Sequence, residues 1–189
     1  MRILGGTHRG RRLRAPDGEG TRPMLAVVRE SIFSICAPWL DGGRVLDLFA
    51  GAGSLGLEAV SRGASSLRAH EIGRAARAAL EANVASIGAE DLVELAALDA
   101  LAPGAWGPGP FDLVFLDPPF PLVRDPDGRG RVLAALEALV AGPLAEEGLV
   151  VLHVPRELEL DAQLPQALAR TFRDHGEQRI WYLQRRAAP

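Results

Sequence analysis

The sequence predicts an α/β fold with a mostly parallel sheet and helices on both of its faces. From Arg44 onward, short aliphatic runs alternate with helical segments, and this alternation is typical of parallel strands joined by helices. A glycine-rich stretch at residues 50–56 separates the first strand of this region from its first helix. The length of 189 residues suits one main domain. We therefore expect a main domain at residues 23–189, preceded by a small basic hairpin or arm at residues 1–22.

The predicted arm is strongly basic. Residues 1–30 contain seven arginines and three acidic residues, whereas residues 31–189 contain fourteen arginines and twenty-one acidic residues. Short extended pieces around Gly5-Gly6 and Gly10 indicate a hairpin. Such charge asymmetry favours a polyanionic partner, with a solvated basic arm as the alternative. The candidate phosphate-binding residues are Arg9, Arg11, Arg12, Arg14 and Arg22.

The remaining elements follow in order from the apolar patterns. A helix is expected at residues 23–40, with Pro23 at its start, and it docks the arm onto the main domain. Strands are expected at residues 44–50, 66–71, 92–98, 112–117, 148–154 and 179–186. Further helices are expected at 54–63, 74–88 and 131–140, the first with Ser54 as N-cap and Gly63 as terminator.

Composition excludes several classes of protein. The single cysteine, Cys36, lies among apolar residues of a predicted helix and reads as a buried structural thiol. One cysteine gives no disulfide or zinc framework, so we expect no metal. The chain has no apolar run of about 18 residues and no charged-then-apolar leader. We therefore expect a soluble, cytoplasmic protein without a membrane partner.

The glycine-rich stretch indicates a nucleotide site. Gly51 and Gly53 allow close approach of a ligand, and Glu71 ends the second strand, where an acid accepts hydrogen bonds from ribose hydroxyls. Gly51, Gly53 and Gly56 also have the spacing of a dinucleotide site, but Asp47 would face the pyrophosphate unfavourably. A ligand with a cationic amino-acid end and no phosphate, such as S-adenosylmethionine, suits the site better. Asp99 then approaches the adenine amine, or is merely a helix cap or surface acid.

Residues 112–120, DLVFLDPPF, carry a second candidate site. Each proline fixes φ and disfavours helix at the residue before it, so Asp117 and Pro118 are held in extended geometry. The motif thus presents a carboxylate, a bare carbonyl and the ring of Phe120 rigidly at the end of a strand. The alternative is a plain turn in which Phe120 fills the core.

These segments together resemble the RsmD-type 16S ribosomal RNA guanine-N2 methyltransferases of bacteria. The resemblance covers nearly the whole chain: RILGGTHRGRRL, TRP, VRESIFSI, LDLFAGAGSLGLEAVSRGA, the helix that ends in Asn83, and FDLVFLDPPF, each in the family's order. It implies a Rossmann-like class I methyltransferase fold with seven strands, the last one antiparallel. It also implies S-adenosylmethionine as donor and a guanine of 16S ribosomal RNA, or of the small ribosomal subunit, as acceptor. We expect a monomer.

The resemblance assigns roles to residues of both motifs. The implied donor-binding residues are Asp47, Phe49, Gly51, Gly53, Glu71, Asp99 and Ala100, and the implied catalytic residues are Asp117, Pro118, Pro119 and Phe120. The Asp117 carboxylate and the Pro118 carbonyl each accept one N–H of the guanine amine, and Phe120 stacks on the base. A base in duplex RNA is inaccessible, so the target lies in a loop or is flipped out.

The chain departs from the family pattern at several positions. Residues 24–27 (Met-Leu-Ala-Val) are apolar where polar residues are common, Gly73 replaces an acid, and Leu152 stands where a glutamate is frequent. Among the histidines, His8 joins the predicted RNA surface, while His70, His153 and His175 are predicted to be structural or solvent-facing.

Other functions stay open at this point. One is a methyltransferase that acts on a protein glutamine or a small-molecule amine, because Pro-Pro-aromatic motifs also serve planar amides. Another is a non-catalytic RNA-binding relative, which the apolar residues 24–27 would suit. A nicotinamide dehydrogenase fits least well, because the sequence shows no hydride-transfer residues.

Overall fold

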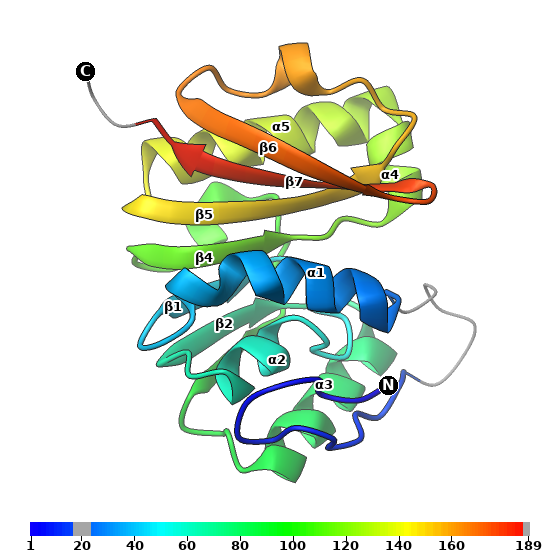
Figure 1. Cartoon of the computed structure of the whole chain (residues 1–189), viewed down its shortest axis with the longest axis vertical. Coiled ribbons are helices and arrows are strands. Elements are labelled where there is room, and N and C mark those ends of the chain that lie inside the picture. The colour runs from blue at the N-terminus through cyan, green and yellow to red at the C-terminus, as the bar shows by residue number, and fades with distance from the viewer. Residues whose placement is uncertain (17–23, 187–189) are drawn as a thin grey trace.

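The computed structural model describes residues 1–16 and 24–186, and they contain a seven-stranded sheet. The strands are β1 (Arg44–Asp47), β2 (Ser66–His70), β3 (Val93–Ala96), β4 (Phe111–Leu116), β5 (Leu144–Pro155), β6 (Leu168–His175) and β7 (Gln178–Arg185). Their order across the sheet is β3-β2-β1-β4-β5-β7-β6 (Figure 1). Strands β1 to β5 are parallel, whereas β7 is antiparallel to both β5 and β6. The predicted α/β class and the antiparallel last strand are confirmed.

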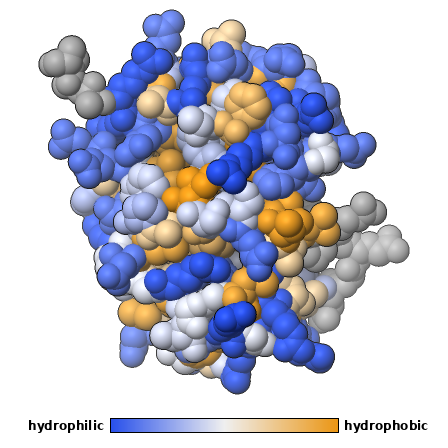
Figure 2. Space-filling model, in the orientation of Figure 1, coloured by the Kyte–Doolittle hydropathy of each residue, from blue (hydrophilic) through white to orange (hydrophobic). Residues whose placement is uncertain are grey.

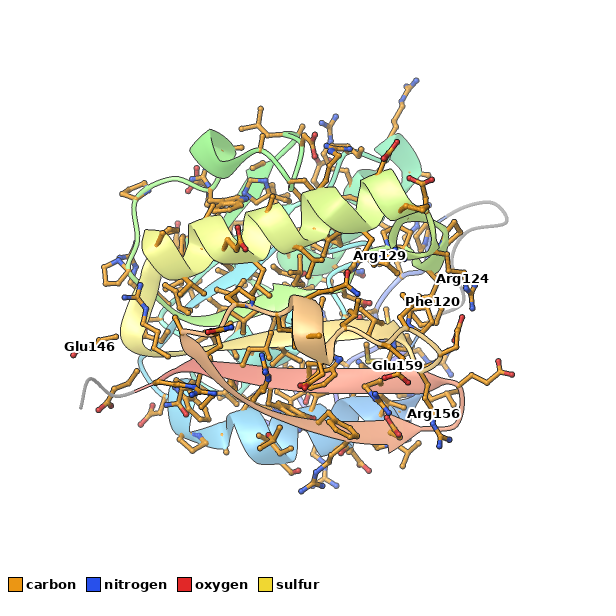
Figure 3. All side chains as sticks on the ribbon, turned by 90° about the horizontal axis from the view of Figure 1, so that it is seen from above. Phe120, Arg124, Arg129, Glu146, Arg156 and Glu159 are labelled. Atoms are coloured by element: carbon orange, nitrogen blue, oxygen red, sulfur yellow. The ribbon has the colours of Figure 1, made fainter. Side chains whose placement is uncertain are left out.

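Helices cover both faces of this sheet. The α-helices are α1 (Ala26–Cys36), α2 (Gly56–Ser61), α3 (Arg74–Ile87), α4 (Phe120–Arg124) and α5 (Pro126–Ala141). Short 3-10 turns are η1 (Ala37–Trp39), η2 (Pro103–Ala105) and η3 (Asp161–Gln163). Figure 3, seen from above, shows α5 on one side of the sheet and α1 on the other. None of the helices in the described residues has the length and apolar character that crossing a membrane requires.

Two hydrophobic cores fill the space between the helices and the sheet. Successive strand residues face opposite sides, so Leu113 joins the core beneath α1, α2 and α3, while Val114 joins the core beneath α4 and α5. Cys36 is buried in the first core, as predicted, and burial raises the pKa of its thiol. The cores hold the sheet rigidly, and the loops at the carboxyl ends of the parallel strands therefore have fixed starting points.

The helix after the glycine loop begins differently from the prediction. Ser54 was expected to be its N-cap, but α2 starts at Gly56, and its first residues have no side-chain cap from the flanking Leu55. Instead, the Asp47 carboxylate at the end of β1 accepts the backbone N–H of Gly56 at 3.0 Å. A long-range acid thus performs the capping that the local sequence pattern assigned to a serine. Gly63 follows the end of the helix with φ +110°, as expected of a terminating glycine.

Other boundaries also differ from the prediction. The helix expected at residues 23–40 ends at Cys36 and continues only as the 3-10 turn η1, and its predicted first residue, Pro23, lies outside the described residues. Helix α5 begins at Pro126, five residues earlier than expected. The Asp125 side chain caps it by accepting the N–H of Gly128 at 2.7 Å. The sequence PDGRG resembles a turn, and this concealed the first turn of the helix.

The apolar pattern of the sequence does not mark β6 as a strand. Most of its side chains are exposed, because it is the outermost strand and hydrogen-bonds only to β7. It therefore lacks the apolar alternation that marks a half-buried strand. It was expected only through the seven-stranded sheet that the family resemblance implies.

The N-terminal arm is a hairpin that packs against the main domain. Its two sides are joined by hydrogen bonds such as that from the Ile3 N–H to the Arg11 carbonyl at 3.0 Å. Ile3 and Leu13 are buried in the core that also contains α1 and α2. From α1, the buried Arg29 donates to the Arg2 carbonyl at 2.8 Å. Helix α1 thus contacts the arm as predicted, but α2 also holds it, through hydrogen bonds at Glu58 and Ser61.

Candidate active site

Three carboxylates meet at the carboxyl edge of the sheet. Asp47 ends β1, Glu71 directly follows β2, and Asp117 directly follows β4. β1 pairs with both β2 and β4, so the three strand ends are neighbours. The chain order also reverses between β1 and β4, and ligands of open α/β sheets bind at such switch points. The tertiary structure thus brings together both motifs that the sequence singled out.

Asp47 is the most deeply buried of the three acids. One carboxylate oxygen, Oδ2, accepts the Gly56 N–H, while Oδ1 is buried and has no hydrogen-bond partner in residues 1–16 and 24–186. Burial, together with the nearby negative charges of Asp117 and Glu71, raises the pKa of Asp47 to about 7, although the backbone N–H groups of Gly56 and Phe49 act to lower it. A buried carboxylate oxygen without a donor is costly. It would be satisfied by a cationic N–H group of a ligand.

Gly51 and Gly53 are required for different reasons. Both have positive φ, +55° and +88°. A Cβ on Gly53 would come within 2.5 Å of Leu80 Cδ1, so this glycine permits close packing of the loop on α3. A Cβ on Gly51 would meet nothing within 4 Å, so it would enter open space at the carboxyl edge. Gly51 therefore keeps room for a ligand, whereas Gly53 shapes the core.

Glu71 holds the glycine loop in place. Its Oε2 accepts the Gly51 N–H at 2.8 Å, and its Oε1 accepts the Gly73 N–H at 2.6 Å. Each oxygen keeps a second lone pair for a ligand hydroxyl. A Cβ on Gly73 would lie 2.8 Å from Oε1. This contact gives a structural reason for the glycine that departs from the family pattern.

The structure engages Asp99 in contacts within the protein. Its Oδ1 accepts the Leu101 N–H at 2.9 Å, and its Oδ2 pairs with the Arg131 guanidinium of α5 at 2.6 Å. The neighbouring Ala100 is buried, and its carbonyl accepts the indole N–H of Trp106 at 2.8 Å. Phe49 is half-buried beside the second core. The predicted contact of Asp99 with adenine stays a prediction.

The Asp-Pro-Pro-Phe motif joins β4 to α4. Pro118 is buried, and Pro119 is exposed with extended geometry (φ −53°, ψ 134°), so the helix starts only at Phe120. The Phe120 ring is half-buried and lies beside Arg124, whose guanidinium carbon is 5.6 Å from the ring centroid (Figure 3). The motif therefore leaves one face of the carboxylate and part of the ring accessible at the carboxyl edge.

His153, which the sequence predicts to be structural or solvent-facing, lies beside Asp117 in this site. Its Nδ1 lies 2.7 Å from Asp117 Oδ1, and its ring packs edge-on against Phe120 with centroids 5.0 Å apart. The sequence contains only part of the signal for this pairing, because it marks the two strand ends but not the register between the strands. Both residues directly follow apolar strand runs, LVFL and LVVL, and the register pairs Leu116 with Leu152, the residue just before His153. Leu152, which stands where a glutamate is frequent in the family, is fully buried within β5.

The arm arginines do not gather at the carboxyl edge. The turn of the arm contacts the end of α2, where the Thr7 N–H donates to the Ser61 carbonyl at 2.7 Å. The exposed Arg11 donates to the Ser86 carbonyl near the end of α3. Both helices start at the carboxyl edge, so these contacts lie toward the opposite edge. The Arg14 backbone, in contrast, is bound to Asn83, whose side chain also donates to Ala52 of the glycine loop.

Arg9 and Arg12 are exposed, and Arg22 lies outside the described residues. The described arginines of the arm are thus exposed to solvent. Figure 2 shows hydrophilic side chains interspersed with some hydrophobic ones over the lower part of the molecule. Whether these arginines bind phosphate stays a prediction.

Comparisons with known proteins agree with this architecture. The sequence model of a family described as Conserved hypothetical protein 95 matches residues 1–184. Putative rRNA methyltransferase YlbH of Bacillus subtilis is 36% identical over 165 residues, which cover 85% of either chain. Ribosomal RNA small subunit methyltransferase D of Escherichia coli is 38% identical over 162 residues, or 84% of this chain and 76% of that one.

A solved structure extends the likeness to the whole fold. The structure of putative methyltransferase yhhF from Escherichia coli is 32% identical, superposes with a TM-score of 0.84, and covers 100% of this chain and 99% of its own. The fold is therefore that of a class I methyltransferase. With the matches in sequence, this likeness shows that the chain belongs to the Conserved hypothetical protein 95 family, which includes ribosomal RNA small subunit methyltransferase D.

Proposed function

We propose that this protein transfers a methyl group from S-adenosylmethionine to the exocyclic N2 amine of a guanine in 16S ribosomal RNA. The observation that carries the proposal is the convergence of two acids with different surroundings at the ends of β1 and β4. Asp47 is buried with an unpaired oxygen, while the Asp117 side chain is 28% exposed at the edge of the sheet. One acid suits a donor's cationic end, and the other suits an acceptor that arrives from solvent.

The residues present fit S-adenosylmethionine. Asp47 Oδ1 would accept from the amino group, the free lone pairs of Glu71 would accept from the ribose hydroxyls, and the open space beside Gly51 would receive the body of the ligand. The bound donor supplies a methyl group already activated on a sulfonium. The residues of this chain then have to bind the donor and the acceptor, orient them, and exclude water.

The Asp-Pro-Pro-Phe motif would orient the guanine amine. The lone pair of this nitrogen is delocalised into the ring, so the amine is a poor nucleophile. Asp117 would accept one N–H and the Pro118 carbonyl the other, which directs the nitrogen toward the methyl group. Phe120 would stack on the base, and stacking of this kind is worth about 1–3 kcal/mol. Well-oriented reactants save roughly 7–11 kcal/mol of barrier, so positioning alone accounts for much of the rate.

The basic arm supports an RNA substrate. Residues 1–16 contain five arginines and no acid, and arginine contacts to phosphate are largely independent of sequence. The arm contacts the ends of α2 and α3, away from Asp117, so its arginines would bind RNA beyond the target base. The base itself would reach Asp117 from a loop or by flipping out of a duplex.

The test is single-turnover transfer of a labelled methyl group to small ribosomal subunits and to naked 16S RNA, followed by mapping of the modified base. Asp117→Ala should lose most of the transfer rate while the protein still binds S-adenosylmethionine. Asp117→Asn keeps an acceptor oxygen and should retain part of the rate. Transfer by the alanine variant at close to the wild-type rate would contradict the role of Asp117. Methylation of a protein glutamine or a free amine in place of RNA would contradict the substrate.

A further inference from the structure

We propose that His153 is a positioning residue that holds the Asp117 carboxylate in the orientation needed for methyl transfer. This inference rests on the proposed function and adds to it a residue outside the Asp-Pro-Pro-Phe motif. Its imidazole Nδ1 lies 2.7 Å from Asp117 Oδ1, and it would donate an N–H there, since an ionised carboxylate can only accept. Oδ1 is thereby fixed, and Oδ2 stays available to accept from the target amine.

The backbone places the two side chains together. β4 and β5 are parallel neighbours with Leu116 opposite Leu152, so the next residues, Asp117 and His153, lie side by side at the carboxyl edge. In a sheet, side chains at corresponding positions of neighbouring strands point to the same face. The contact is therefore set by the register of two central strands and does not depend on a mobile loop.

The surroundings of His153 favour a proton on Nδ1. Its Nε2 lies 3.2 Å from Oε1 of Gln178 on β7. If the imidazole is charged, it donates to both partners. If it is neutral, a half-turn of the Gln178 amide presents an N–H to Nε2, while Nδ1–H still donates to Asp117. In the neutral tautomer with its proton on Nε2, the lone pair of Nδ1 would face the Asp117 carboxylate at 2.7 Å. The two would repel each other, so this tautomer is disfavoured.

His153 acts through its neighbours, because its imidazole is already engaged by Asp117, Gln178 and Phe120. Its side chain is only 8% exposed. It also packs edge-on against Phe120 with ring centroids 5.0 Å apart. One buried imidazole thus supports both the carboxylate that aligns the amine and the ring that stacks on the base. Within the described part of the chain, no other side chain contacts both residues by a hydrogen bond or ring interaction.

Three variants of His153 separate the hydrogen bond from packing. His153→Leu removes the donor, and kcat should fall roughly 10- to 100-fold, the value of a hydrogen bond to a charged group. KM for RNA should change little, since His153 does not touch RNA. His153→Asn places an amide N–H where Nδ1 was and should restore most of the rate. His153→Gln is the matched control, because its amide lies one carbon further out, near the position of Nε2, and it should not restore the rate.

A leucine variant that is folded by thermal melting and keeps the wild-type kcat would overturn the proposal. An asparagine variant as slow as the leucine variant would also overturn it. A second measurement does not depend on activity. ¹⁵N NMR of histidine-labelled protein, with His153 assigned by its loss in His153→Asn, should show a proton on Nδ1. A proton on Nε2 alone would overturn the proposal.

The two measurements also separate this inference from the proposed function. If wild-type protein transfers no methyl group to ribosomal RNA, the proposed function fails, and the NMR result then decides whether His153 donates to Asp117. If transfer is present but independent of the His153 donor, only the positioning role fails.

Discussion

Replacing Glu58 by glutamine should loosen the N-terminal arm. Glu58 is fully buried in α2, and its carboxylate joins the arm to the domain. Oε2 accepts the Leu4 N–H at 2.6 Å, and Oε1 accepts the Gly5 N–H and the Arg62 Nε–H, both at 2.8 Å. A glutamine has the same shape but only one acceptor oxygen, so its NH₂ group must face at least one backbone N–H.

The expected loss follows from these contacts. Glu58→Gln forfeits at least one charge-assisted hydrogen bond, worth about 1.5–3 kcal/mol, which for a chain of this size lowers Tm by about 3–12 °C. The measurement is thermal melting followed by circular dichroism, with hydrogen exchange at Leu4 and Gly5 to locate the change. The matched control is Glu137→Gln on the exposed face of α5, which should shift stability by no more than about 0.5 kcal/mol.

Equal melting temperatures for the two variants would refute the reasoning. So would a loss of stability in Glu58→Gln with unchanged exchange at Leu4 and Gly5, because the cost would then arise elsewhere. The expected pattern is a lower Tm with faster exchange confined to the arm.

Three further predictions concern the donor site and the arm. Gly51→Ala should weaken binding of S-adenosylmethionine, measured by calorimetric titration, and should lower stability by about 1–2 kcal/mol because of its positive φ alone. Gly53→Ala adds a clash with Leu80, so it should lower stability by about 1–3 kcal/mol more. Equal melting temperatures for the two variants would contradict the packing argument. The pKa of Asp47 is raised to about 7 in the folded protein, above its unfolded value of about 3.9. Between these pH values the folded protein therefore binds one proton more than the unfolded chain does. The contribution of Asp47 to the free energy of unfolding should thus fall as the pH rises from about 4 to about 7. Donor binding should in contrast tighten as the pH rises toward the pKa of Asp47, and both slopes should flatten in Asp47→Asn. Replacing Arg9 and Arg12 by alanine should weaken RNA binding and reduce its salt slope by about 0.7–0.9 for each phosphate that is no longer neutralised, and an unchanged slope would mean that these arginines are merely solvated.

The sequence by itself determined the fold class and the two motifs at the strand ends. Both depend on local information. Apolar alternation records which face of a strand is buried, and glycine, proline and acidic residues at strand ends record backbone constraints. Asp47, Glu71 and Asp117 could therefore be identified, because parallel strands place their carboxyl ends at one edge of the sheet.

Only the tertiary structure decided which distant groups pair. Asp47 caps the helix that Ser54 was expected to cap, because the carboxylate reaches Gly56 from the neighbouring strand end. Glu58 of α2 binds backbone N–H groups of Leu4 and Gly5, more than fifty positions away in the sequence.

The position of His153 depended on the register between β4 and β5, which no local pattern specifies. The outer strand β6 lacked an apolar pattern because it has one neighbour and most of its side chains are exposed. The residue at each position indicates burial and backbone constraints there, whereas the hydrogen-bond partners of distant residues depend on how the strands and helices pack. For that reason the location of this site was predictable, and the interactions that hold its residues in place were not.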